Sequence, residues 1–156
     1  MSSICVYCSS SNAIAETYPP VAEALGRTLA QRGHDLLYGG GTVTGVIPKK
    51  LQSREGIAYD ADELIVTDTM RERKRIMYER ADAFAVLPGG YGTLEEFMEV
   101  LTLKQLGYHD HPIALVNVDG FFETLLSFFG ELEEGRFARA PVTDLVHVVP
   151  SAEAAL

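Results

Sequence analysis

Short apolar runs alternate with segments of helical spacing along most of this chain. The apolar runs have the lengths of buried strands and cover residues 4–7, 36–38, 83–87, 113–118 and 146–149. The helical segments between them lie at about 19–33, 69–81, 93–107 and 121–134. This alternation is typical of βαβ units, in which helices cover a parallel sheet. The sequence therefore predicts an α/β fold with a mostly parallel central sheet flanked by helices.

Length, composition and charge narrow the class of protein. A chain of 156 residues has the size of one domain, and 47% hydrophobic and 22% charged residues are ordinary globular values. The 13 basic and 22 acidic residues give a net charge of −9, which repels a nucleic-acid backbone. The first residues lack the features of a signal peptide, and no apolar run reaches the ~18 residues that span a bilayer. We expect a single domain (1–156) that is cytoplasmic and binds neither nucleic acid nor membranes.

Two short motifs raise the question of redox or metal chemistry. Cys5 and Cys8 have C-x-x-C spacing, but they lie in an apolar run, whereas redox motifs sit where a strand gives way to a helix. His109 and His111 flank Asp110 without a third ligand nearby in the sequence. We interpret the cysteines as strand residues and expect neither a metal nor a cofactor.

One predicted connection is too short for this fold. Only residues 39–45 separate the apolar runs at 36–38 and 46–47, whereas a parallel crossover needs about a dozen residues or more. Either these two strands pair antiparallel, or a segment is missing. The G-G-G-T loop at 39–42 should open a helix, and no helical pattern follows it. We favour a missing segment between Val43 and Thr44.

The strongest candidate for a ligand site is the glycine-rich segment L-P-G-G-Y-G-T-L-E-E at 87–96. It follows a predicted strand and opens a predicted helix, so backbone N–H groups and the positive end of the helix dipole would face a ligand. Ligands of open α/β sheets collect at the carboxyl ends of strands, and this arrangement suits a phosphate. The segment matches neither Walker A nor G-x-G-x-x-G. A tight turn without a ligand is the alternative.

Within this segment, Thr93 and Glu96 allow two interpretations. Their T-x-x-E spacing matches a capping box, in which each side chain bonds to a backbone N–H of the first helical turn. A carboxylate beside a phosphate loop can instead serve as a base. The sequence leaves both roles of Glu96 open. The remaining helix has an apolar stripe that predicts core residues: Leu94, Phe97, Met98 and Leu101.

Basic residues cluster once, in the segment M-R-E-R-K-R at 70–75. The buried face of this helix is predicted at Met70, Met77 and Ala81. Arg73 and Lys74 occupy the positions where that face should continue. Because an unpaired buried charge is costly, we predict a buried anion or carboxylate partner for both residues.

The glycine motif, the M-x-x-R-K motif at 70–74 and the G-G-G-T loop together resemble the LOG ("lonely guy") family. These are cytokinin riboside 5′-monophosphate phosphoribohydrolases, often labelled lysine decarboxylase-like. The resemblance extends from C-V-Y-C-S-S at 5–10 to A-L-V-N-V-D-G at 114–120. It implies a Rossmann-like homodimer that hydrolyses the N-glycosidic bond of a nucleoside 5′-monophosphate, giving free base and ribose 5-phosphate. Family members carry a helix and part of a strand where this chain has its short connection.

The resemblance also implies roles for individual residues. It makes Arg73 and Glu96 the catalytic pair. The nucleotide-binding positions that it implies are Glu55, Lys74, Gly90, Tyr91, Gly92, Thr93, Leu94, Glu95 and Thr102. In glycoside cleavage, a carboxylate stabilises the oxocarbenium-like transition state or activates water. A fixed cation offsets charge on the departing base or holds the carboxylate.

Two other functions compete with hydrolysis of cytokinin riboside or adenosine 5′-monophosphates. A non-catalytic protein of the same fold would bind a nucleotide or a nucleotide-like cofactor without cleaving it. An amino-acid decarboxylase, the older family label, needs pyridoxal phosphate on a lysine, and the sequence outlines no such site.

Overall fold

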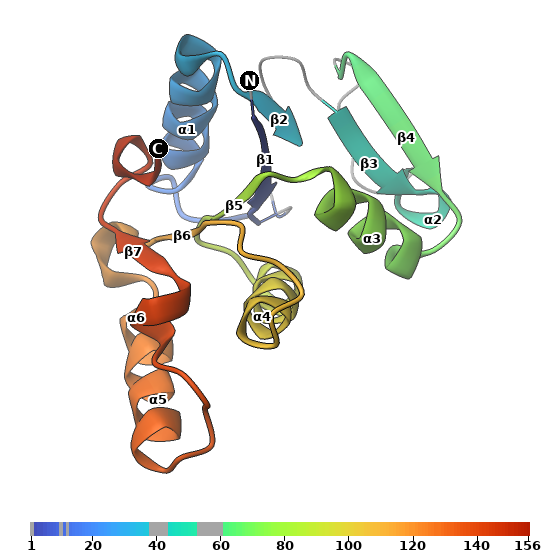
Figure 1. Ribbon diagram of the computed structural model, residues 1–156. Coiled ribbons are helices and arrows are strands. Elements are labelled where there is room, and N and C mark those ends of the chain that lie inside the picture. The colour runs from blue at the N-terminus through green and yellow to red at the C-terminus, as the bar shows by residue number, and fades with distance from the viewer. Residues whose placement is uncertain (1, 10, 12, 38–43, 53–60) are drawn as a thin grey trace.

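The computed structural model of the chain describes residues 2–9, 11, 13–37, 44–52 and 61–156. A five-stranded sheet forms its centre, with the strand order β2-β1-β5-β6-β7 (Figure 1). Its strands are β1 (Ser3–Tyr7), β2 (Asp35–Leu37), β5 (Ala83–Val86), β6 (Ile113–Val116) and β7 (His147–Val149). Every neighbouring pair in this sheet is parallel. The predicted parallel sheet is therefore confirmed.

Helices cover both faces of the sheet, as a Rossmann-like, three-layer fold requires (Figure 1). One face carries α1 (Pro19–Arg32) and the C-terminal 3-10 turn η2 (Glu153–Ala155). The other carries α3 (Met70–Arg80), α4 (Tyr91–Gln105), α5 (Glu123–Glu134) and α6 (Val142–Leu145). A short 3-10 turn, η1 (Val118–Gly120), precedes α5. Each helix in the described ranges is too short or too polar to cross a bilayer.

Local signals explain where α1 and α3 begin and end. Pro19 opens α1 with a backbone angle already suited to a helix, and Gly33 ends it with a φ of 71°. The Thr69 side chain caps α3 by accepting a hydrogen bond from the Glu72 backbone N–H at 3.1 Å. Of the predicted buried face of α3, Met77 and Ala81 are buried, whereas Met70 is 45% exposed.

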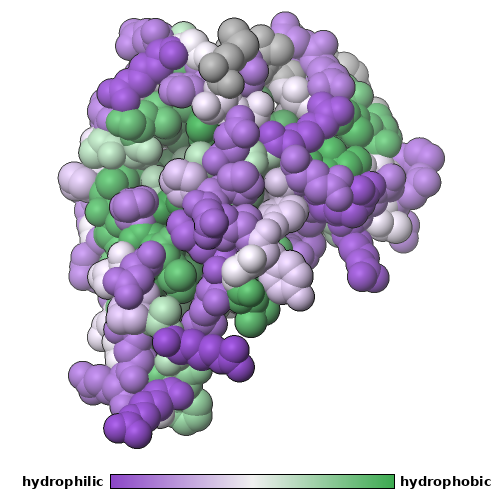
Figure 2. Space-filling model, in the orientation of Figure 1, coloured by the Kyte–Doolittle hydropathy of each residue, from purple (hydrophilic) through white to green (hydrophobic). Residues whose placement is uncertain are grey.

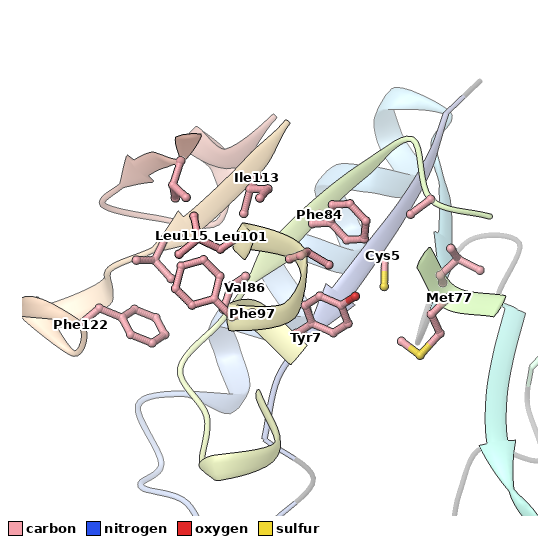
Figure 3. Packing of buried hydrophobic residues seen from close by; sticks show 14 of the residues in the cluster. Cys5, Tyr7, Met77, Phe84, Val86, Phe97, Leu101, Ile113, Leu115 and Phe122 are labelled. Carbon is pink, nitrogen blue, oxygen red and sulfur yellow. The ribbon is translucent and has the colours of Figure 1, made fainter. Parts of the chain in front are cut away.

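Two apolar cores lie on either side of the sheet because successive strand residues point to opposite faces. On β1, Ile4 and Val6 pack under α1, whereas Cys5 and Tyr7 face α3 and α4. Figure 3 shows the second of these cores, in which the rings of Tyr7 and Phe84 stack with centroids 5.9 Å apart. The α4 residues Phe97, Val100 and Leu101 are buried there, whereas Met98, predicted to be core, is 39% exposed.

A second, two-stranded parallel sheet stands beside the main one. It consists of β3 (Thr44–Pro48) and β4 (Glu63–Thr67), with the one-turn helix α2 (Lys49–Gln52) after β3. The strand β4 was not predicted from the sequence. Leu64 and Val66 point outward from β4, and each is 41% exposed. The sequence of β4 therefore lacks the alternation of apolar and polar residues that is typical of a strand with one buried face. Figure 2 shows the resulting apolar area at the upper right.

The strand predicted at 46–47 therefore pairs with β4 and not antiparallel with the run at 36–38. The G-G-G-T loop and the rest of 38–43 lie outside the described residues.

Candidate functional site

The strand order of the main sheet predicts the edge at which a ligand would bind. From β1 the chain continues to β2 on one side, whereas β5, β6 and β7 follow one another on the other side. Ligands of open α/β sheets bind outside the carboxyl ends of the strands at such a reversal. The segment after β5 is the glycine-rich turn that the sequence singled out. It therefore lies at the predicted edge, next to the carboxyl end of β1.

The glycine-rich turn feeds directly into α4. Gly90 is the N-cap residue and makes no side-chain cap, so the first N–H groups of α4 have no partner from a cap side chain. A Cβ on Gly89 would lie 2.1 Å from Thr93 Oγ1, and Thr93 is only 3% exposed. A Cβ on Gly92 would have open space around it. The turn can therefore hold an anion over the helix N-terminus, with Tyr91, 93% exposed, beside it.

The capping-box interpretation of Thr93 and Glu96 is wrong. Because α4 starts at Tyr91, Thr93 is already inside the first turn and Glu96 belongs to the second. The Glu96 carboxylate instead accepts a hydrogen bond from Arg73. Glycine at the N-cap position allows this earlier start, since it adopts the extended cap conformation without a side-chain partner.

Arg73 of α3 and Glu96 of α4 form an ion pair at the side of the glycine-rich turn. Their Nη1 and Oε1 atoms are 2.6 Å apart, and the side chains are only 18% and 10% exposed. The Arg73 Nε–H also donates to the backbone carbonyl of Val46 in β3 at 3.0 Å. The predicted carboxylate partner of Arg73 is therefore confirmed. Two elements, β3 and α4, fix the plane of the guanidinium group.

Burial dominates the electrostatics of this pair. It raises the pKa of the Glu96 carboxyl above its usual value, and the neighbouring Arg73 charge partly opposes this shift. Burial also raises the pKa of Cys5 to about 12 and shifts the pKa of Cys8 upward. Both thiols are free. Cys5 is a strand residue, as predicted, whereas Cys8 follows the last residue of β1.

Lys74 is the second basic residue of α3 that faces α4. Its Nζ lies 2.5 Å from Glu95 Oε1 and 2.9 Å from Glu99 Oε2, and its side chain is 21% exposed. The prediction of carboxylate partners is confirmed for Lys74 as well. The sequence analysis did not single out Glu99. Its position four residues after Glu95, on one face of α4, was the available signal.

The other predicted site residues are not all in this cluster. Leu94 is half-buried against the core beneath the turn. Thr102 lies on another side of α4, in a groove of about 150 Å³ between α4 and α5. Glu55 lies outside the described residues. The structure therefore brings together Arg73, Lys74, Glu95 and Glu96, and it places Thr102 elsewhere.

In the 109–111 segment, both ring nitrogens of His109 contact backbone atoms. The His109 ring is buried; its Nε2 contacts the Val100 carbonyl oxygen at 2.9 Å, and its Nδ1 accepts the His111 backbone N–H at 3.2 Å. Within the described ranges, no three His, Cys, Asp or Glu side chains come together in a way that could hold a metal ion.

Comparison with known proteins shows a family match over most of the chain. The family model described as "Possible lysine decarboxylase" matches residues 29–156. Cytokinin riboside 5′-monophosphate phosphoribohydrolase LOG2 of Arabidopsis thaliana is 40% identical over 166 residues, which cover 96% of this chain and 78% of the relative. Cytokinin riboside 5′-monophosphate phosphoribohydrolase LOG of Oryza sativa subsp. japonica is 46% identical over 142 residues, which cover 80% of this chain and 59% of the relative.

Solved structures share the fold at lower identity. The molybdenum cofactor carrier protein of Chlamydomonas reinhardtii superposes with a TM-score of 0.70 at 24% identity, covering 99% of this chain and 92% of the other. The molybdenum cofactor binding protein of Rippkaea orientalis gives a TM-score of 0.65 at 21% identity, with 97% and 90% covered. At such identities the likeness concerns the fold alone.

Proposed function

The chain belongs to the family described as "Possible lysine decarboxylase", and we propose that it is a hydrolase of cytokinin riboside or adenosine 5′-monophosphates. It would cleave the N-glycosidic bond and release the free base and ribose 5-phosphate. The relatives at about 40% identity carry the name of this activity. We propose that the reaction takes place in the cytoplasm.

The observation that carries this proposal is the shielded Arg73–Glu96 pair beside the glycine-rich turn at the start of α4. Glycoside cleavage needs a carboxylate near the anomeric carbon, where positive charge develops in the transition state. Glu96 is the best-shielded carboxylate of the cluster, and the turn that would bind the phosphate belongs to the same helix. One rigid helix would thus set the distance between the phosphate anchor and the reacting bond.

In the proposed reaction, a water oxygen forms a bond to the anomeric carbon while the bond to the base nitrogen breaks. The electron pair of that bond stays on the base, which takes up a proton, and the water loses one. Glu96 stabilises the developing positive charge or accepts the proton of the water. Arg73 remains protonated and holds the Glu96 carboxylate in place or offsets charge on the departing base.

Binding of the 5′-phosphate is assigned to the backbone of the turn from Gly90 to Thr93. The N–H groups of Tyr91, Gly92 and Thr93 belong to the first turn of α4 and have no partner within the helix. Phosphate binding there would supply binding energy at a distance from the scissile bond. Glu55, Leu94 and Glu95 remain proposed contacts of the nucleotide, as the family resemblance implies, whereas Thr102 lies in the separate groove between α4 and α5.

The proposal is tested by incubating the purified chain with AMP and with isopentenyladenosine monophosphate and measuring free base by chromatography. We expect base release by the native chain and a loss of about 100-fold or more in Glu96→Gln and Arg73→Ala. Arg75→Ala is the matched control, because Arg75 pairs with Glu79 on the exposed side of the same helix. Circular dichroism establishes that each variant is folded.

Binding of either monophosphate without base release would contradict the proposal. It would favour the alternative function, a non-catalytic protein that carries a nucleotide or a nucleotide-like cofactor.

A further inference from the structure

Lys74 lies immediately after Arg73 on α3, yet its surroundings differ. Two carboxylates, Glu95 and Glu99, approach its ammonium group within 2.9 Å, from adjacent turns of α4. The Lys74 side chain is 21% exposed, whereas Glu95 and Glu99 are 58% and 43% exposed. The lysine is therefore the inner member of the cluster, and the carboxylates close over it from the solvent side.

This arrangement matters because Glu96 lies within the same stretch of α4. Glu95 raises the pKa of Glu96 and Lys74 lowers it, in addition to the larger effects of burial and of Arg73. The ion pairs with Glu95 and Glu99 in turn raise the pKa of Lys74, so its charge is permanent near neutral pH. The ionisable groups around Glu96 are Arg73 and Lys74 from α3, Glu95 and Glu99 from α4, Cys5 and Tyr7 from β1, and Cys8 just after β1.

We propose that Lys74 is a positioning residue, which ties α3 to α4 through Glu95 and Glu99 and offsets the carboxylate charge next to Glu96. Its ammonium group contacts these two carboxylates in the free protein. The effect of Lys74 on catalysis rests on the proposed hydrolase function. Its electrostatic effect on Glu96 is a property of the free protein.

The first test needs no substrate. Carboxyl carbon NMR measures the titration of Glu96 in the native chain, in Lys74→Met and in Glu99→Gln. We expect Lys74→Met to raise the Glu96 pKa by about half a pH unit, because a nearby positive charge is lost. Glu99→Gln should shift the same pKa in the opposite direction, because a nearby negative charge is lost. Lys74→Arg should restore the native value.

Arg75→Met is the matched control for this titration, since it removes a cation of α3 whose partner, Glu79, lies on the same helix and away from α4. An unchanged Glu96 pKa in Lys74→Met would overturn the proposal. If Lys74→Met does not fold, Lys74→Gln is titrated in its place, and an unchanged Glu96 pKa in that variant overturns the proposal.

The second test separates positioning from substrate binding. In Lys74→Met, the acid limb of the kcat profile should move to higher pH by about the same half unit, with KM for AMP changed less than about threefold. A tenfold or larger rise in KM, together with an equal loss of ribose 5-phosphate affinity, would show instead that Lys74 binds the phosphate. If the native chain releases no base, the proposed hydrolase function is wrong. The NMR titration still tests the effect of Lys74 on the Glu96 pKa.

Discussion

Individual residues of the glycine-rich turn differ sharply in what they tolerate. Gly89 faces the Thr93 side chain at a distance that leaves no room for a Cβ, whereas Gly92 faces open space at the start of α4. The same contrast separates Arg73, held by two partners and shielded, from Arg75, whose side chain is 59% exposed. We therefore expect Arg73 to tolerate substitution less well than Arg75.

At Gly89 we expect Gly89→Ala to destabilise the fold by about 1–3 kcal/mol, because its Cβ must displace the buried Thr93 side chain. Gly92→Ala should leave the free energy of unfolding nearly unchanged, and Gly92→Leu should lower the affinity for ribose 5-phosphate by about tenfold or more. Thermal unfolding and isothermal titration calorimetry measure the two effects. Equal stability of Gly89→Ala and Gly92→Ala would contradict the packing argument.

At the scale of the elements, α4 connects the site to the rest of the protein. Its N-terminus forms the glycine-rich turn, its second turn carries Glu96, and its C-terminal half is held by the segment that leads into β6. There His109 accepts the His111 N–H and contacts the Val100 carbonyl, so a neutral ring suits this position. Tyr78 of α3 adds a hydrogen bond to the Tyr108 carbonyl at 3.3 Å.

The His109 ring makes the stability of this region pH-dependent. Burial lowers the pKa of His109 below its usual value, so the unfolded chain takes up the proton first as the pH falls. The contribution of the neutral His109 ring to the free energy of unfolding is therefore complete above about pH 6.5. It is lost as the pH falls from there toward the lowered pKa of His109.

We expect the melting temperature of the native chain to fall between pH 7 and pH 5 more steeply than that of His109→Gln. His147→Gln, which changes an exposed histidine at the start of β7, should keep the native slope. Identical slopes for the native chain and His109→Gln would exclude His109 as the source.

At the scale of the whole molecule, the separation of β3–β4 from the main sheet is the feature that most needs an explanation. The alignment with LOG2 extends over 166 residues, more than the 156 residues of this chain, so the relative carries residues without a counterpart here. We propose that these residues belong between Val43 and Thr44, where the connection is short. A helix there would shield Leu64 and Val66 on the outer face of β4.

Inserting the corresponding residues of the relative between Val43 and Thr44 should raise the melting temperature by about 4–8 °C, since two half-exposed apolar side chains become buried. A glycine-serine insertion of equal length at the same place should bring no gain. Hydrogen exchange of β3 and β4 should slow only in the first chimera. If both insertions behave alike, the segment belongs elsewhere.

We also propose a homodimer that uses the side of α4 facing away from α3. This side carries Met98 at the groove, and Leu106 is exposed beyond it. Light scattering should give twice the 17.1 kDa mass of the chain, and Leu106→Glu should weaken association. Leu64→Asp, which changes an exposed apolar residue of β4, is the control. A 17.1 kDa species at all concentrations would contradict the dimer.

Much of the fold could be predicted from the sequence, because strand and helix periodicity, proline and glycine boundaries and the Thr69 cap act over a few residues. The strands of the main sheet, α1 and α3 were predicted for these reasons. The missed strand β4 has an outward apolar face, which obscures the local pattern. The start of α4 was misplaced because Gly90 serves as a cap that leaves no side-chain signal.

The sequence by itself determined that this chain is an α/β protein with a glycine-rich turn at a strand end and two charged residues on a face expected to be buried. Only the tertiary structure decided which groups meet. Arg73 pairs with a carboxylate 23 residues away and with a carbonyl 27 residues away, and Lys74 contacts α4 at two successive turns. Such pairings depend on how α3 and α4 pack beside each other on one face of the sheet. Residue spacing along the sequence does not contain that information.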